Sequence, residues 1–188
     1  MNSIAQDTIS HTSAYEQLQD LARNFWRWRA EHQPVSSDDI PRIERPPSWV
    51  PDWSIKTLRA RRTDLACFEA EWKSIDPSSW SITEQVDYRL IGSALARVRW
   101  ELDITRSHEI NPDFYINQTL GAIYLLLLPP PPFDQQRSAE LVTRMRNIPR
   151  TVAEAKINLD PAAVKPFALA ALEKLKDVDG RLSKWSPS

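Results

Sequence analysis

Residues 81–107 read SITEQVDYRLIGSALARVRWELDITRS, and this stretch decides the fold. Its apolar residues recur at spacings of three and four, the period of one face of an α-helix; they are Tyr88, Ile91, Leu95, Val98 and Leu102. Ser81 followed by Glu84 has the pattern of a capping box, which marks a helix start. The stretch therefore predicts a long amphipathic helix from about Ser81 to Ser107.

Two further apolar stripes of helical period precede this helix. The first predicts a helix that a capping box at Ser13 and Glu16 opens and that ends near Gln33, before Pro34; its members are Leu18, Leu21, Phe25 and Trp28. The second predicts a helix that Ser54 caps and that runs to about Ile75; its members are Leu58, Leu65, Phe68, Trp72 and Ile75.

The join between this second helix and the helix at 81–107 is short. Short joins make neighbouring helices antiparallel, so the sequence predicts a hairpin. Counting outward from the turn places Phe68 near Tyr88, with Gly92 letting the two helices approach closely. Cys67 stands beside Phe68, and we expect it in the core.

Prolines and capping residues divide the remainder of the chain. Asn111 before Pro112 predicts a fourth helix to about Leu128, whose apolar end, 122–128, we expect to be buried on all sides. Asp134 predicts a fifth helix to about Ile148, Pro149 a sixth to about Leu159, and Pro161 or Pro166 a seventh that Gly180 closes. No stretch alternates like a strand. The expected fold is an all-α bundle of about seven helices.

A proline- and tryptophan-rich connector, Pro34 to Trp53, links the first two of these helices. Its prolines exclude a regular helix or a central strand. Its aromatic and aliphatic residues favour a segment pinned on the fold over a disordered linker; they are Ile40, Ile43, Trp49 and Trp53. Residues 1–11 are expected to be a disordered leader, and 12–188 a single helical domain.

Composition excludes several classes of partner. The 188 residues carry 24 basic and 25 acidic side chains, a net charge of −1, which predicts no nucleic-acid and no membrane partner. The longest apolar run, 122–128, is too short to cross a bilayer. One cysteine and no signal-peptide pattern predict a reducing, cytoplasmic location.

The residues that carry chemistry are few and scattered. His108-Glu109 begins like the zinc motif His-Glu-x-x-His, but the fifth position is Pro112, so we expect a solvated histidine. Asp38, Asp39 and Glu44 are expected to be surface ion partners of nearby arginines rather than paired catalytic carboxylates. The sequence therefore predicts no catalytic, cofactor-binding or metal-binding residue.

Three arginines near the start of the second helix are also expected to be structural. Arg59 and Arg61 are predicted to lie on a solvated face. Arg62 falls at the edge of the apolar stripe, so an internal salt bridge is the expectation for it.

Several long segments resemble one family. They include FWRWRAEHQPVSSDDIPRIERPPSWVPDW (25–53) and NPDFYINQTLGAIYLLLLPPPPF (111–133). Together with the segments between and after them, they are similar to the N-terminal half of the bacterial family called domain of unknown function 885. That family consists of largely helical proteins that resemble zinc carboxypeptidases and are about three times as long.

The resemblance implies a scaffold without the catalytic machinery. The zinc motif of the family lies in a C-terminal half that this chain lacks, so zinc is expected only there and the chain alone is expected to be inactive. Tyr115 and Gln118 lie in the matching segment 111–133, so the resemblance implies that they contribute weakly to the wall of a substrate cleft. The implied partner is the catalytic half or a second copy; the alternative is a free-standing protein–protein interaction module. An orphaned apolar patch is expected near 112–128 or the connector.

Overall fold

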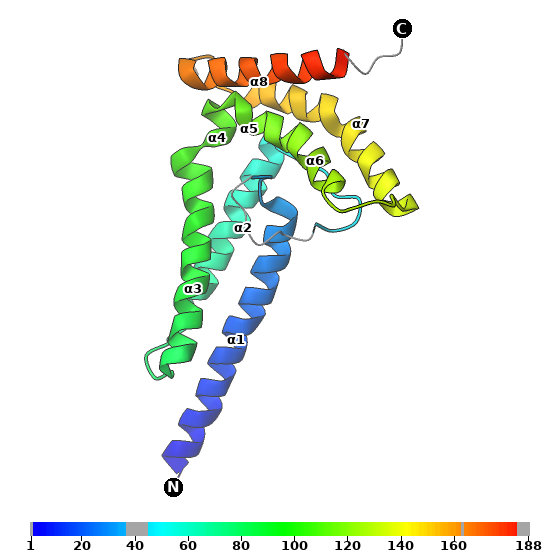
Figure 1. The fold of residues 1–188 in the computed structure, drawn as a ribbon. Helices are drawn as coiled ribbons and strands as arrows, with labels where there is room; N and C mark the ends of the chain where they lie inside the picture. The colour runs from blue at the N-terminus through cyan, green and yellow to red at the C-terminus, as the bar shows by residue number, and fades with distance from the viewer. Residues whose placement is uncertain (1, 37–44, 163, 184–188) are drawn as a thin grey trace. The chain divides into compact units, whose positions relative to one another are not determined.

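The computed structural model describes residues 2–36, 45–162 and 164–183, with side-chain surroundings for 14–36, 45–162, 164–180 and 183. Eight α-helices and two π-helical segments are present in these ranges (Figure 1). In chain order they are α1 (Asn2–His32), α2 (Ile55–Ser74), α3 (Ile82–Arg99), η1 (Trp100–Thr105), α4 (Ser107–Ile110), α5 (Pro112–Ile116), η2 (Asn117–Gly121), α6 (Ala122–Leu127), α7 (Gln135–Asn158) and α8 (Lys165–Ser183). The described residues contain no strand, which confirms the predicted all-α fold.

The number of continuous helices is close to the seven expected. The segment η1 prolongs α3, and η2 joins α5 to α6 without a break. Internal contacts group the chain into two compact units: unit 1 is Met1–Gln33 with Leu58–Thr105, and unit 2 is Pro34–Thr57 with Arg106–Ser188. The predicted single domain over 12–188 stays a prediction, because two compact units can belong to one domain.

Unit 1 consists of α1, most of α2, and α3 with η1. The apolar stripes predicted for these helices form its core, in which the most enclosed side chains are Leu18, Leu21, Phe25, Leu65, Leu95 and Val98. The ring of Phe25 packs edge-on against Phe68 at 5.7 Å and lies stacked on Trp28 at 6.1 Å, measured between centroids. Aromatic rings bury a large apolar area each, so these contacts contribute to the core of unit 1.

Helices α2 and α3 are antiparallel, as predicted, but their register differs from the prediction. Trp72, and not Phe68, lies beside Tyr88: the two rings stack at 4.7 Å and the indole N–H donates to the Tyr88 carbonyl at 3.0 Å. Gly92 faces the Trp72 ring. The glycine therefore makes room for an indole, and Phe68 packs on α1 instead.

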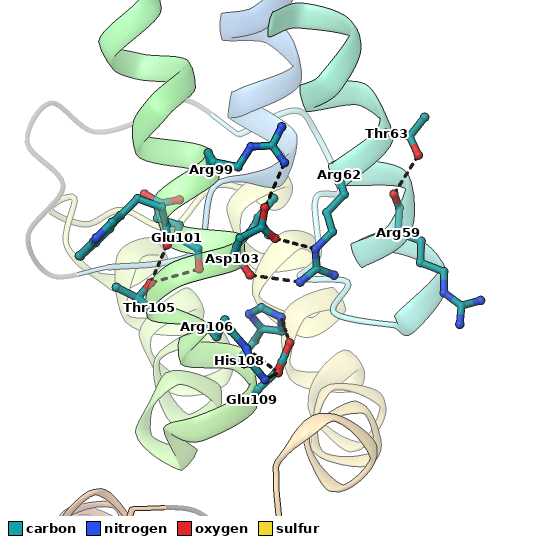
Figure 2. Close-up of polar contacts among 12 residues, drawn as sticks. Arg59, Arg62, Thr63, Arg99, Glu101, Asp103, Thr105, Arg106, His108 and Glu109 are labelled. Atoms are coloured by element: carbon teal, nitrogen blue, oxygen red, sulfur yellow. Dashed lines mark hydrogen bonds and ion pairs between the residues drawn. The ribbon is translucent and has the colours of Figure 1, made fainter.

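Ion pairs join α2 to the α3–η1 helix further from the turn (Figure 2). Arg62 Nε donates to Asp103 at 2.9 Å, and Arg99 pairs with both Asp103 at 3.0 Å and Glu69 at 2.5 Å. Burial raises the pKa of Asp103, but the hydrogen bonds from Arg62 and Arg99 outweigh it and lower that pKa below its usual range. The internal salt bridge predicted for Arg62 is confirmed.

The neighbouring arginine departs from its prediction. Arg61 is only 4% exposed, because it lies on the same face as the buried residues Leu58 and Leu65. The expectation that it belongs to a solvated face is wrong, whereas Arg59 is exposed as expected. Arg61 lies three residues after Leu58 and four before Leu65, so its position on the helix buries it although its side chain is charged.

Unit 2 contains the connector and the helices from α4 onward. Arg106, at φ 45°, separates η1 from α4. The Asn111 side chain accepts the Asp113 N–H at 3.0 Å with Pro112 next to it, as predicted for a helix start. Asp134 caps α7 in the same way, through the Arg137 N–H at 2.7 Å. Helix α5 packs on α7 and α8, and α6 packs on α7.

Three predicted helix boundaries are wrong. Helix α1 begins at Asn2, so it includes residues 2–11, expected as a leader, and Ser13 does not open it; no proline or glycine interrupts this stretch. Pro149 lies inside α7 rather than starting a helix. It removes one hydrogen bond, to the carbonyl of Met145, a residue that is 52% exposed to solvent. Gly180 lies inside α8, where nothing crowds it.

Two burial predictions are also corrected. The apolar end of the fourth predicted helix is covered on one side only: Ala122 is 1% exposed, whereas Tyr124 is 60% and Leu127 is 46% exposed. An apolar run marks a hydrophobic helix but does not say how many neighbours cover it. Cys67 is exposed, because it lies two positions after Leu65 and thus away from the buried face of α2.

Candidate functional site: a polar and aromatic cluster in unit 2

The cluster holds the connector against the helices of unit 2. Gln118, in η2, is 1% exposed, and its amide grips the backbone of Val35 at two points. The Val35 N–H donates to Oε1 at 2.9 Å, and Nε2 donates to the Val35 carbonyl at 3.0 Å. A third bond joins Nε2 to the Phe114 carbonyl at 3.3 Å. Gln118 therefore fixes the start of the connector.

Tyr115 lies at the centre of a second set of hydrogen bonds. Its hydroxyl donates to the His108 carbonyl at 2.8 Å and accepts from Asn158 Nδ2 at 2.9 Å. The same Asn158 amide donates to the Trp53 carbonyl at 2.6 Å. The phenol thus links α4 to α7 by donating one hydrogen bond and accepting another, and the Asn158 amide links α7 to the end of the connector.

Aromatic rings surround these bonds. Trp53 stacks on His108 at 6.1 Å and packs edge-on against Phe114 at 4.5 Å between centroids. His108 is 2% exposed, with its Nε2 3.3 Å from a carboxylate oxygen of Glu109 (Figure 2). The expectation of a solvated histidine is wrong, because the ring is a packing partner for Trp53 and not a helix-end surface group.

A series of ion pairs and hydrogen bonds from Asp52, Arg150 and Glu154 also holds Trp53. Glu154, in α7, accepts the Trp53 N–H at 2.9 Å, and Arg150 Nε donates to Glu154 at 3.0 Å. Arg150 also pairs with Asp52. Burial raises the pKa of Asp52, but hydrogen bonds from Ser54 and Arg150 outweigh it, and the pKa is lowered to about 2. Asp52 is therefore ionised at any pH near neutral.

Trp49 fixes the middle of the connector. It is 9% exposed, and the guanidinium groups of Arg45 and Arg144 lie 4.1 and 5.3 Å from its ring centroid. Arg144 Nη1 donates to the Ala122 carbonyl at 2.6 Å, and burial lowers the pKa of Arg144 from its ordinary value. The prediction that the connector is pinned on the fold is confirmed for Pro34–Ser36 and Arg45–Trp53; Ile40 and Ile43 lie outside the described residues.

The two predicted site residues, Tyr115 and Gln118, both lie within this cluster, where their side chains have a structural role. Tyr115 is 5% exposed and Gln118 is 1% exposed, and both are saturated by backbone and side-chain partners. Their role as the wall of a substrate cleft stays a prediction. The acidic residues Asp38, Asp39 and Glu44 lie outside the described residues.

Sequence reasoning missed Glu154 and Asn158. Both lie on the face of α7 that meets the connector, and each hydrogen-bonds the backbone of Trp53, about a hundred residues earlier in the chain. The only local signal is the spacing of Arg150 and Glu154, four apart on a helix, which predicts an ion pair but not its partner at Trp53.

The chemistry of the cluster is that of a clamp. Its carboxylates accept hydrogen bonds from a backbone amide and from arginine, and its phenol and amides are engaged with carbonyl groups. Across the part of the chain that the structure describes, no three His, Cys, Asp or Glu side chains converge as metal ligands do. None of the described helices combines the length and apolar character needed to cross a membrane.

Comparisons with protein families, with curated proteins and with solved structures found no match to this chain. The family resemblance thus rests on the sequence segments alone.

Proposed function

We propose that this chain is the N-terminal helical scaffold of a larger metallopeptidase-like protein of the type named domain of unknown function 885. In this proposal catalysis and zinc belong to the remaining part of that protein, and the chain supplies rigid support and a docking face. The clamp of unit 2 supports the first role, because it makes a proline-rich connector part of the packed helices.

The observation that carries the proposal is the apolar stripe of α8. Ala171, Leu172 and Leu175 fall within one face of α8 at helical spacing, and Val164 directly precedes the helix. Ala171 is 3% exposed against α5, yet Leu172 and Leu175 are 53% and 47% exposed, and Val164 is 44% exposed. A helix face that is half covered within unit 2 supports a docking role, since a soluble monomer ordinarily buries such a stripe.

Electrostatics add a second attachment for α8. Lys174 Nζ lies 2.8 Å from Asp113, at the start of α5. The Lys174 side chain is 48% exposed and that of Asp113 is 26% exposed, so solvent screens the pair, which contributes about 0–1 kcal/mol and does not replace apolar burial. The half-exposed leucines of α8 therefore leave a docking face that a further covering element can bury.

The test is binding of a separately produced C-terminal half from a full-length family member. Calorimetric titration of the chain with that half should show association, and Leu172→Glu should weaken it at least tenfold. Ala170→Glu is the matched control, because it puts the same charge on an exposed position of α8 on the opposite side from the stripe. No association of the two halves would refute the scaffold proposal.

The alternative is a free-standing helical interaction module, which the same exposed stripe supports. A hydrophobic dye separates the two. If the chain binds no catalytic half but binds the dye through α8, with Leu172→Glu abolishing dye binding and Ala170→Glu leaving it intact, the free-standing module is favoured.

A further inference from the structure

A groove runs along the surface of unit 1 between α1 and α3. Its volume is about 400 Å³, and its walls are mainly apolar, with Leu18, Ala22 and Trp26 from α1 and Leu90 and Ile91 from α3. Leu90 is 61% exposed and Trp26 is 49% exposed. Two large apolar side chains therefore border a hollow that unit 1 itself leaves open.

The residues of α1 that face the groove repeat at helical period. Tyr15, Gln19, Ala22 and Trp26 follow one another at spacings of four, three and four. A groove between two helices can bind the apolar face of a third helix, whose contacting residues recur at the same spacing of three and four. The occupant that fits is thus a helix with a large apolar side chain set a few residues from a small one.

Helix α1 is itself such a helix, and its charges are self-complementary. Glu16 lies six residues before Ala22 and Arg27 lies five after it. Both are exposed, and neither has a hydrogen-bond or ion-pair partner among the described residues. They lie on the same flank of α1, and in an antiparallel pair of helices equivalent flanks face each other.

We propose that a second copy of this chain occupies the groove, with the two α1 helices antiparallel about a two-fold axis near Ala22. In this arrangement Trp26 of each copy lies over Leu18 of the other, where the groove has room for an indole. Glu16 of each copy pairs with Arg27 of the other at both ends. The interface is isologous and therefore closes as a dimer. The proposal is independent of the docking face on α8, which belongs to unit 2.

Charge reversal tests the pairing directly on the full chain. Sedimentation equilibrium should show a reversible dimer, and Glu16→Arg or Arg27→Glu alone should weaken dimerisation about tenfold or more by placing like charges together. The double variant E16R/R27E should recover most of the affinity. Glu71→Arg and Lys73→Glu are matched controls, since both positions are exposed on α2 away from the groove, and they should leave the dimer unchanged.

A disulfide locates the axis independently. In a Cys67→Ser background, Ala22→Cys should form an intermolecular disulfide quickly on mild oxidation, whereas Gln17→Cys, on the far side of α1, should not. A chain that stays monomeric up to about 0.5 mM overturns the proposal and leaves the groove to a helix of another protein. A dimer that ignores both single charge reversals, or that cross-links equally through position 17, also overturns it.

Discussion

Replacing Gly92 with alanine should destabilise the protein, although alanine is the better helix former. A Cβ atom at this position would lie 2.4 Å from Cζ2 and 2.9 Å from Cε2 of Trp72, well inside van der Waals contact. The indole has little freedom to move away. The Tyr88 ring stacks on the indole at 4.7 Å between centroids, and the indole N–H donates to the Tyr88 carbonyl at 3.0 Å.

The magnitude follows from opposing terms. Forcing a methyl group into a packed site costs about 1–3 kcal/mol. Displacing the indole far enough to break its hydrogen bond adds about 1 kcal/mol. The change from glycine to alanine inside a helix returns about 1 kcal/mol. The net loss in the free energy of unfolding should therefore be about 1–3 kcal/mol.

Urea unfolding followed by far-ultraviolet circular dichroism measures this loss, and the chain provides its own control. Gly180→Ala, inside α8 where the added methyl group meets nothing within 4 Å beyond its chain neighbours and its own helix backbone, should gain about 0.5–1 kcal/mol. The cost of Gly92→Ala should also shrink in a Trp72→Leu background. A Gly92→Ala variant as stable as the wild-type protein, with an unchanged denaturant slope, would refute the reasoning.

Three further predictions concern unit 2 and α2. Gln118→Ala should cost about 2–4 kcal/mol in the same unfolding assay, because it leaves two backbone groups of the buried Val35 without partners. Asp52 has a lowered pKa of about 2, so its stabilisation is complete above about pH 4 and is lost as the pH falls from 4 to 2. The stability of Asp52→Asn, measured by thermal melts between pH 4 and 2, should fall less with acid than that of the wild-type protein. The difference should be on the order of 1 kcal/mol after allowance for solvent screening. Cys67 is exposed and should react with a thiol reagent in the native protein at nearly the rate of a free thiol. A thiol that reacts only after the protein unfolds would contradict this placement.

Local signals were sufficient for most of the helices. The capping box at Ser81 and Glu84 is present with both of its hydrogen bonds, and the Asn111 and Asp134 caps are formed. These features depend on residues three or four apart, whose geometry a helix determines by itself. Burial at Leu65, Leu95 and similar stripe positions follows from the same periodicity.

The errors arose where distant segments decide the outcome. The register of the α2–α3 hairpin depends on the Trp72 indole lying between the helices, which counting from the turn does not include. Pro149 and Gly180 lie inside α7 and α8 although they cost about 3 and about 1 kcal/mol relative to alanine, because the rest of each helix continues on both sides of them. The cluster of unit 2 joins Gln118 to Val35 and Glu154 to Trp53, pairs separated by 83 and 101 positions. No local pattern specifies such pairs.

The amide of Gln118 also has a protective consequence. Val35 lies outside the helices, and its N–H and C=O are both bonded to one side chain, as they would be to the opposite residue of an antiparallel β-sheet. A free extended segment offers these groups to strands of other molecules, which is a route to aggregation. By acting as a one-residue substitute strand, Gln118 closes that edge at Val35. Loss of this glutamine should therefore raise the tendency to aggregate as well as lower stability.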